Sequence, residues 1–182
     1  MFEKEEKSMQ LCLDLDGIEL ILGVKNFRYS KSMEDELWTD VYISVHNEFI
    51  NYETQGELLE CWEVSDLKEK IKDLLEDKQL AIDELSFLEP DIAFHFMPSF
   101  TRKVGENGCV YVAPGHEFVK CGAELIISLY LKGSLSGHAI SLILAADDLE
   151  KLYNYLRFVT KEIKEDDPIV VEYLNKGILV NF

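Results

Sequence analysis

The alternation of apolar and polar residues along the first half of the chain predicts β-strands. In residues 38–45, β-branched apolar residues alternate with polar residues or tyrosine. This two-residue period is that of a strand with one face in a core. Residues 11–15 show the same period, and the Asp16-Gly17 pair after them favours a type I′ turn, in which both central residues need a positive φ. We therefore expect a hairpin whose return strand covers residues 18–29.

A second hairpin and a helix are predicted next. The run from Tyr52 to Val64 is expected to return antiparallel to residues 38–45, with a bulge or twist point at Gly56. Ser65 has the chemistry of a helix N-cap, and an apolar stripe at helical spacing follows it, which predicts a helix over residues 65–78. The stripe consists of Leu67, Ile71, Leu74 and Leu75.

A second helix is predicted over residues 147–163. Asp147 is the expected N-cap, and Glu150 three residues later completes a capping box. Its expected apolar face consists of Leu149, Leu152, Tyr153, Leu156 and Ile163. Further strands are expected at residues 85–88, 92–97, 109–112, 124–131 and 138–145, and the extended C-terminal segment 166–182 is expected to hold one more from Ile169 on.

Together these elements predict an α+β fold. We expect a mainly antiparallel, twisted β-sheet, as one sheet or as two, with the two helices covering apolar faces. A chain of 182 residues with 47% hydrophobic residues can bury a core of its own. Residues 1–182 are therefore expected to form a single domain.

The charge of the chain limits its partners. Eighteen basic residues stand against 35 acidic ones, which gives a formal net charge of −17. Such an imbalance disfavours nucleic acid and anionic membranes as partners, and it favours a basic one. An acidic surface also keeps many proteins soluble without any further role.

Cysteine usage and the N-terminus indicate a cytoplasmic protein. The four cysteines form no C-x-x-C pair and stand in or near apolar segments, as buried free thiols of a reducing compartment do. The first residues are charged and carry no apolar signal region, and no apolar run approaches the ~18 residues of a membrane span.

No catalytic, metal or cofactor site is predicted. Gly133-Ser-Leu-Ser-Gly137 has leucine where a nucleophile elbow needs serine, so it is read as a hairpin loop. The four histidines lack any spacing that would place two on one helix face. His95 could form an acid/base set with Glu89 and Asp91, but a polar strand face explains these residues better.

Two groups of acids without matching bases are the candidate partner-binding residues. The first group consists of Glu34, Asp35, Glu36 and Asp40 in an expected loop, and the second of Glu162, Glu165, Asp166 and Asp167 at an expected helix end. By contrast, acids and lysines nearly balance in the predicted helix over residues 65–78. Each group could equally be a solvated loop end.

The order of motifs resembles that of the WapI-type immunity proteins of bacteria. The motifs are Trp38-x-Asp-Val-x-Ile-x-Val45, Gly56-Glu-Leu58, the helix that begins Asp66-Leu67, Phe87-Leu-Glu-Pro-Asp-Ile-x-Phe94, the strand over residues 124–131 and Leu149-Glu-x-Leu-Tyr-x-x-Leu156. The similarity covers residues 36–160, and this chain departs from the pattern in its longer 98–120 region and in its tail.

This resemblance implies a small cytosolic protein that binds and neutralises the toxic C-terminal domain of a contact-delivered toxin, which in this family can be a nuclease acting on tRNA. The implied role needs no catalysis and no cofactor. Two other classes stay open at this point. One is a small-molecule- or protein-binding β-rich module with a pocket between its curved sheet and its helices, and the other is an uncharacterised enzyme.

Overall fold

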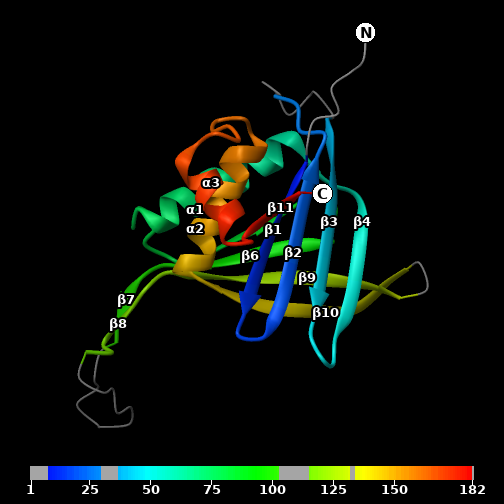
Figure 1. Cartoon of the computed structure of the whole chain (residues 1–182). Coiled ribbons are helices and arrows are strands. Elements are labelled where there is room, and N and C mark those ends of the chain that lie inside the picture. The colour runs from blue at the N-terminus through cyan, green and yellow to red at the C-terminus, as the bar shows by residue number, and fades with distance from the viewer. Residues whose placement is uncertain (1–7, 30–36, 103–114, 132–133, 182) are drawn as a thin grey trace.

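A computed structural model describes residues 8–29, 37–102, 115–131 and 134–181. Two antiparallel sheets form most of the molecule (Figure 1). The first has five strands in the order β11-β1-β2-β3-β4. These are β1 (Met9–Leu15), β2 (Ile18–Lys25), β3 (Trp38–His46), β4 (Asn51–Glu60) and β11 (Leu179–Asn181).

The second sheet has four strands in the order β10-β9-β6-β5, and its strands run across those of the first sheet (Figure 1). These are β5 (Asp83–Ser86), β6 (Ile92–Met97), β9 (Gly122–Leu131) and β10 (Ser134–Ala145). The short strands β7 (Phe100–Thr101) and β8 (Phe118–Val119) pair only with each other, and they form an arm that extends away from the two sheets.

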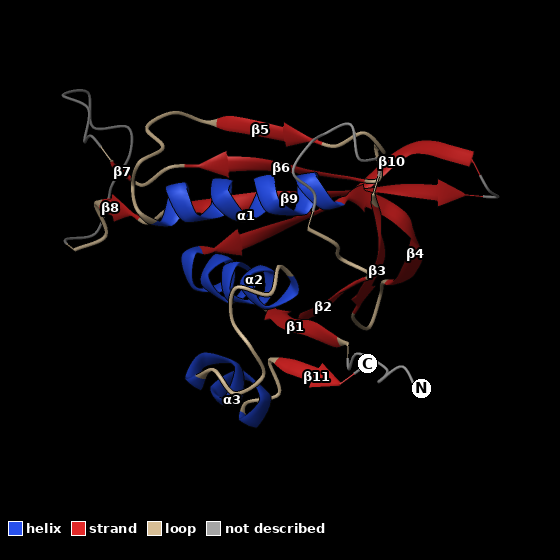
Figure 2. Ribbon diagram, turned by 90° about the horizontal axis from the view of Figure 1, so that it is seen from above, coloured by secondary structure: helices blue, strands red, loops and turns tan. Residues whose placement is uncertain are grey.

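Three helices complete the α+β fold. They are α1 (Cys61–Leu75), α2 (Ala146–Val159) and α3 (Pro168–Asn175). Figure 2 shows α1 beside β6 and β9, and α2 between α1 and β1. Helix α2 contacts α1, α3 and both sheets, so it is the helix around which the others are arranged. The predicted α+β class with mainly antiparallel, twisted sheets is confirmed.

The predicted turn between the first two strands is confirmed at residue level. Asp16 has φ 54° and Gly17 has φ 89°, as a two-residue turn between antiparallel strands requires. The register pairs Leu15 with Ile18, and it places alternate residues of both strands in the core. The irregularity expected at Gly56 lies instead at Leu58, because Thr39 pairs with Leu59 while Asp40 pairs with Glu57.

The first helix begins earlier than predicted, at Cys61, and it ends at Leu75 instead of residue 78. Its N-terminus is capped by the Glu63 carboxylate, which accepts hydrogen bonds from the backbone N–H of Glu60 (2.8 Å) and of Leu88 (2.7 Å). Glu63 is 1% exposed, and burial raises the pKa of its carboxyl group. Ser65, the expected cap, lies inside the helix, and its hydroxyl donates to the carbonyl of Cys61.

The second helix also starts earlier than predicted, and it is shorter. It begins at Ala146, and the Asp148 carboxylate accepts from the Ala145 N–H at 3.3 Å, so the expected Asp147–Glu150 capping box does not form. It ends at Val159, because Lys161 takes a left-handed conformation (φ 62°) that turns the chain away.

The C-terminal segment was predicted to be extended, and this is wrong for its first half. Asp167 caps helix α3 by accepting from the Ile169 N–H at 3.0 Å, and Pro168 occupies the first turn, where its missing N–H costs nothing. Only β11 is a strand, and it pairs antiparallel with β1. The strand expected at residues 85–88 also has other bounds, since β5 begins and ends two residues earlier, at Asp83–Ser86.

Tyr155 connects the central helix to the first sheet. Its side chain is fully buried, and its hydroxyl donates to the carbonyl of Met9 (3.1 Å) while it accepts from the N–H of Val24 (2.8 Å). Both hydrogen bonds satisfy backbone groups of neighbouring strands that would otherwise be buried without a partner. Burial raises the pKa of the Tyr155 hydroxyl, so it stays a neutral donor.

We predict that Tyr155→Phe lowers the free energy of unfolding by about 1–3 kcal/mol, because two buried backbone groups lose their partner while the ring still fills its site. Denaturant unfolding of both proteins measures the difference. Tyr153→Phe is the control, since Tyr153 is only half-buried and packs beside Arg157. Equal losses in the two variants would contradict a special role for the Tyr155 hydroxyl.

Candidate partner-binding surface

The predicted acidic groups lie in different environments. Glu34, Asp35 and Glu36 fall outside the described residues. Asp40, expected in a loop, lies in β3 on the solvent-facing side of the five-stranded sheet. Its carboxylate accepts a hydrogen bond from the side-chain amide of Asn26, and it stands opposite Lys25 of β2.

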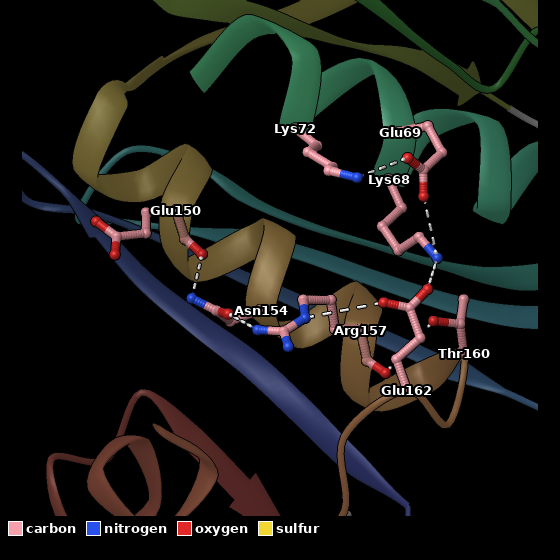
Figure 3. Close-up of polar contacts among 8 residues, drawn as sticks. All are labelled: Lys68, Glu69, Lys72, Glu150, Asn154, Arg157, Thr160 and Glu162. Carbon is pink, nitrogen blue, oxygen red and sulfur yellow. Dashed lines mark hydrogen bonds and ion pairs between the residues drawn. The ribbon is translucent and has the colours of Figure 1, made fainter. Parts of the chain in front are cut away.

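Glu162 does have basic partners, contrary to the prediction. Figure 3 shows its carboxylate between Lys68 of α1 and Arg157 of α2. It forms an ion pair with Lys68, whose side chain is only 7% exposed, and it lies 3.8 Å from the Arg157 Nε. Because a buried ammonium group needs a counter-charge, Glu162 stabilises the contact between the two helices. Its side chain is still 42% exposed, so a partner could reach it.

Two other members of the second group line a groove. Glu165 and Asp166 are exposed and line an open groove of about 1080 Å³ together with Lys161 and Lys164 of the same segment. Asp167 is partly buried, because it caps α3. The opposite wall of the groove includes Lys25, Asn26 and Phe27 at the end of β2.

The groove brings members of the two predicted acidic groups near one another. Asn26, which lines the groove, donates its side-chain hydrogen bond to Asp40. Asp40 from the first group and Glu165 and Asp166 from the second are therefore neighbours of one groove, although more than 120 residues separate them in sequence. Lysines share this groove, so its charge is mixed.

A further set of acids lies on the five-stranded sheet and is not visible as a run in the sequence. They stand at alternate strand positions on the solvent-facing side of the sheet, where the register pairs Asp14 with Glu19 and Asp40 with Glu57. They are Asp14 of β1, Glu19 of β2, and Glu53 and Glu57 of β4, which join Asp40 of β3 on this face. In the sequence these acids are the polar residues of the alternating strand patterns, so they are not consecutive and do not form a visible acidic run.

His95 belongs to a polar row on the solvent-facing side of the other sheet. Its Nδ1 lies 3.1 Å from the Glu124 carboxylate of β9, and its Nε2 lies 3.8 Å from that of Glu84 on β5. Ser141 of β10 donates to the other oxygen of Glu124 at 2.5 Å. The hydrogen bond from Ser141, and then that from His95, lowers the pKa of Glu124.

This row does not form the arrangement of a nucleophilic enzyme. The Ser141 hydroxyl donates to the Glu124 carboxylate instead of to the imidazole, and this carboxylate is a weak base because its pKa is lowered. The His95 ring contacts Glu84 and Glu124. These contacts do not form the acid/base set with Glu89 and Asp91 that the sequence suggested. Among the described residues, no three His, Cys, Asp or Glu side chains are grouped to hold a metal ion.

The interior between sheets and helices leaves almost no free space. The apolar cavity there has a volume of about 20 Å³, enough for about one water molecule. Fourteen aliphatic or aromatic residues line it, among them Leu11, Ile43 and Phe94. A ligand pocket between the sheet and the helices, as the alternative class requires, is therefore not present at this place.

The chain matches a known family over most of its length. The sequence model of the immunity protein WapI-like family matches residues 11–157. The chain belongs to this family. The match begins before the region of resemblance at residues 36–160, and it includes the β1–β2 hairpin. A comparison with curated proteins finds no relative of the chain.

In this WapI-like immunity protein, the segment after the family match completes the first sheet. Helix α3 packs on α2, where Asn154 donates to the Tyr173 hydroxyl at 3.3 Å, and β11 extends the sheet beside β1. No helix in the described part of the chain is long and apolar enough to cross a membrane.

We predict that Ser141→Ala raises the pKa of Glu124 towards that of an ordinary glutamate, because the carboxylate loses the hydrogen bond that favours its charged form most. The lowered pKa in the folded protein means that this group stabilises the fold above the ordinary glutamate pKa of ~4.3, and that this stabilisation is lost as the pH falls through the folded value. NMR titration of the Glu124 side chain measures the shift. Glu84, which has no bond to Ser141, is the internal control, and an unchanged Glu124 pKa would contradict the analysis.

Proposed function

We propose that this chain binds the toxic domain of a bacterial toxin in the cytoplasm and neutralises it by binding, without catalysis. The observation that carries this proposal is the family match over residues 11–157. The absence of an enzyme-like arrangement in the His95 row, the only acid/base candidate found in the sequence, agrees with it.

The charge of the chain supports a basic toxin domain, of which a nuclease is the obvious kind. A nuclease must hold the phosphates of its substrate, so its surface is basic around the active site. A partner with a net charge of −17 would be attracted to that surface and would associate with it faster than a neutral protein. Binding there would also deny the nucleic acid access to the site.

We further propose that the predicted acidic residues contribute to this attraction to different degrees. Glu165 and Asp166 are exposed, so their charges are available to a partner, whereas Asp40 is half-buried opposite Lys25 and contributes less. Glu162 is less available, because it compensates Lys68 and Arg157. Asp167 caps α3, so its carboxylate is needed where it is.

The test uses the toxin domain encoded beside the gene of this chain. We expect the wild-type chain to form a complex with it and to protect cells that express it. A variant with Asp40→Lys, Glu165→Lys and Asp166→Lys should associate about tenfold more slowly, and with a weaker dependence on salt, because charges at the rim act mainly on the association rate. Stopped-flow association across a salt series measures both effects.

The control carries three lysines in place of other exposed acids, at Glu48, Glu89 and Glu150. It changes the net charge by the same amount at places that lie in neither predicted acidic group. If the two variants associate equally fast, attraction is a property of the whole charge and not of the predicted residues. If the wild-type chain neither binds nor protects, the proposed function itself is wrong.

A further inference from the structure

Strand β4 has an open edge at the end of the five-stranded sheet. It pairs with β3 on one side, in an uninterrupted register from Asn51 to Glu57, and no strand of the described residues pairs with its other side (Figure 1). Alternate backbone N–H and C=O groups of an edge strand point away from the sheet, so they can pair with another extended chain. Tyr52 holds this strand in place, since its hydroxyl donates to the carbonyl of Ser128 in β9 at 3.3 Å.

The other described sheet edges fit such a partner less well. Strands β11 and β5 have three and four residues, against ten in β4. Strand β10 is long, but its register shifts between Leu135 and Ala139, and it packs against α2 and β1. The regular part of β10, Ala139–Ala145, is as long as the regular part of β4, but it leads directly into α2, so β4 is the more accessible of the two long edges in the part of the chain that the structure describes.

The side chains of β4 define the chemistry of the strand that it could accept. Glu53, Gln55 and Glu57 are exposed on the outer face, whereas Tyr52, Thr54 and Gly56 between them are half-buried. Asp40 stands directly opposite Glu57 on β3 and adds a further carboxylate to that end. The edge therefore presents carboxylates four residues apart, on one face.

The charges of β4 favour a basic partner over a second copy of the chain. If two β4 strands paired antiparallel around Gln55, Glu53 of each copy would face Glu57 of the other, and like charges directly opposite each other destabilise a strand pair. Pairing around Thr54 would avoid these contacts but would bring no cation to either carboxylate. A strand with Lys or Arg at two positions four residues apart would instead place a cation opposite each carboxylate.

We propose that an extended segment of the toxin domain pairs with the free edge of β4, with basic residues opposite Glu53 and Glu57. This proposal rests on the proposed function and names the surface through which it is exerted. Backbone hydrogen bonds would provide most of the contact, and the two glutamates would set the register and the choice of partner.

Residue-resolved hydrogen exchange with the toxin domain tests the proposal. In the free chain, the amides of residues 51–57 that point to β3 should exchange slowly and those that point outward should exchange fast. In the complex, the outward amides should become protected at every second residue. A variant with Glu53→Lys and Glu57→Lys should bind about tenfold more weakly, because two favourable cross-strand pairs become unfavourable.

The matched control is Glu19→Lys with Glu150→Lys, two exposed acids away from β4 that change the net charge by the same amount. It should weaken binding much less than the β4 variant. If the chain binds and neutralises the toxin while the outward amides of β4 stay fast, or if both variants bind alike, the edge proposal is wrong and the proposed function stands. If no complex forms, both proposals fail.

Discussion

The attachment of α2 to the first sheet is the contact on which the rest of the structure depends. A helix packed on a sheet normally meets side chains only, but the Tyr155 hydroxyl reaches the backbone of β1 and β2 and satisfies a donor on one strand and an acceptor on the other. This fixes the distance and the rotation of α2 over the sheet. Helices α1 and α3 then pack on either side of α2, and β10 leads directly into it.

Two further polar contacts hold the remaining parts against this centre. The pair of Lys68 and Glu162 connects α1 to the chain after α2, and the Glu63 carboxylate connects the start of α1 to the loop before β6. Lys68 and Glu63 are buried, so a lost partner would leave the Lys68 ammonium group without its counter-charge or the Glu63 carboxyl group without its hydrogen bonds. The helices are thus held in one arrangement, and both sheets keep one face for solvent or for a partner.

Most strands could be predicted from the sequence because their period of two is explicit, although the strand expected at residues 109–112 lies outside the described residues. The Asp16-Gly17 turn could be predicted because its chemistry is specific. The first residues of the helices were harder to predict from the sequence. Ser65 has good capping chemistry, yet Glu63 caps α1 because the loop before β6 supplies a second donor for its carboxylate. Helix α3 was misread because a short apolar run suits a strand as well as a helix, although Asp167-Pro168 is itself a helix-start signal.

The surface was harder to predict than the fold, for a related reason. Acids next to one another in sequence are visible as a run, but Glu57 and Asp40 become neighbours only through the register of β3 and β4. The same holds for His95, whose partners Glu84 and Glu124 come from the strands on either side. Local chemistry indicates which residues are polar, whereas strand pairing decides which of them act together.

The central claim is that this family member acts by binding and not by turnover. A titration of active toxin domain with increasing amounts of the chain tests it most directly. The account predicts that residual toxin activity falls linearly to zero at one equivalent, independently of incubation time, and that dissociating the complex restores the toxin. Loss of toxin activity at a small fraction of one equivalent, growing with time and not reversed on separation, would show catalysis and contradict the account.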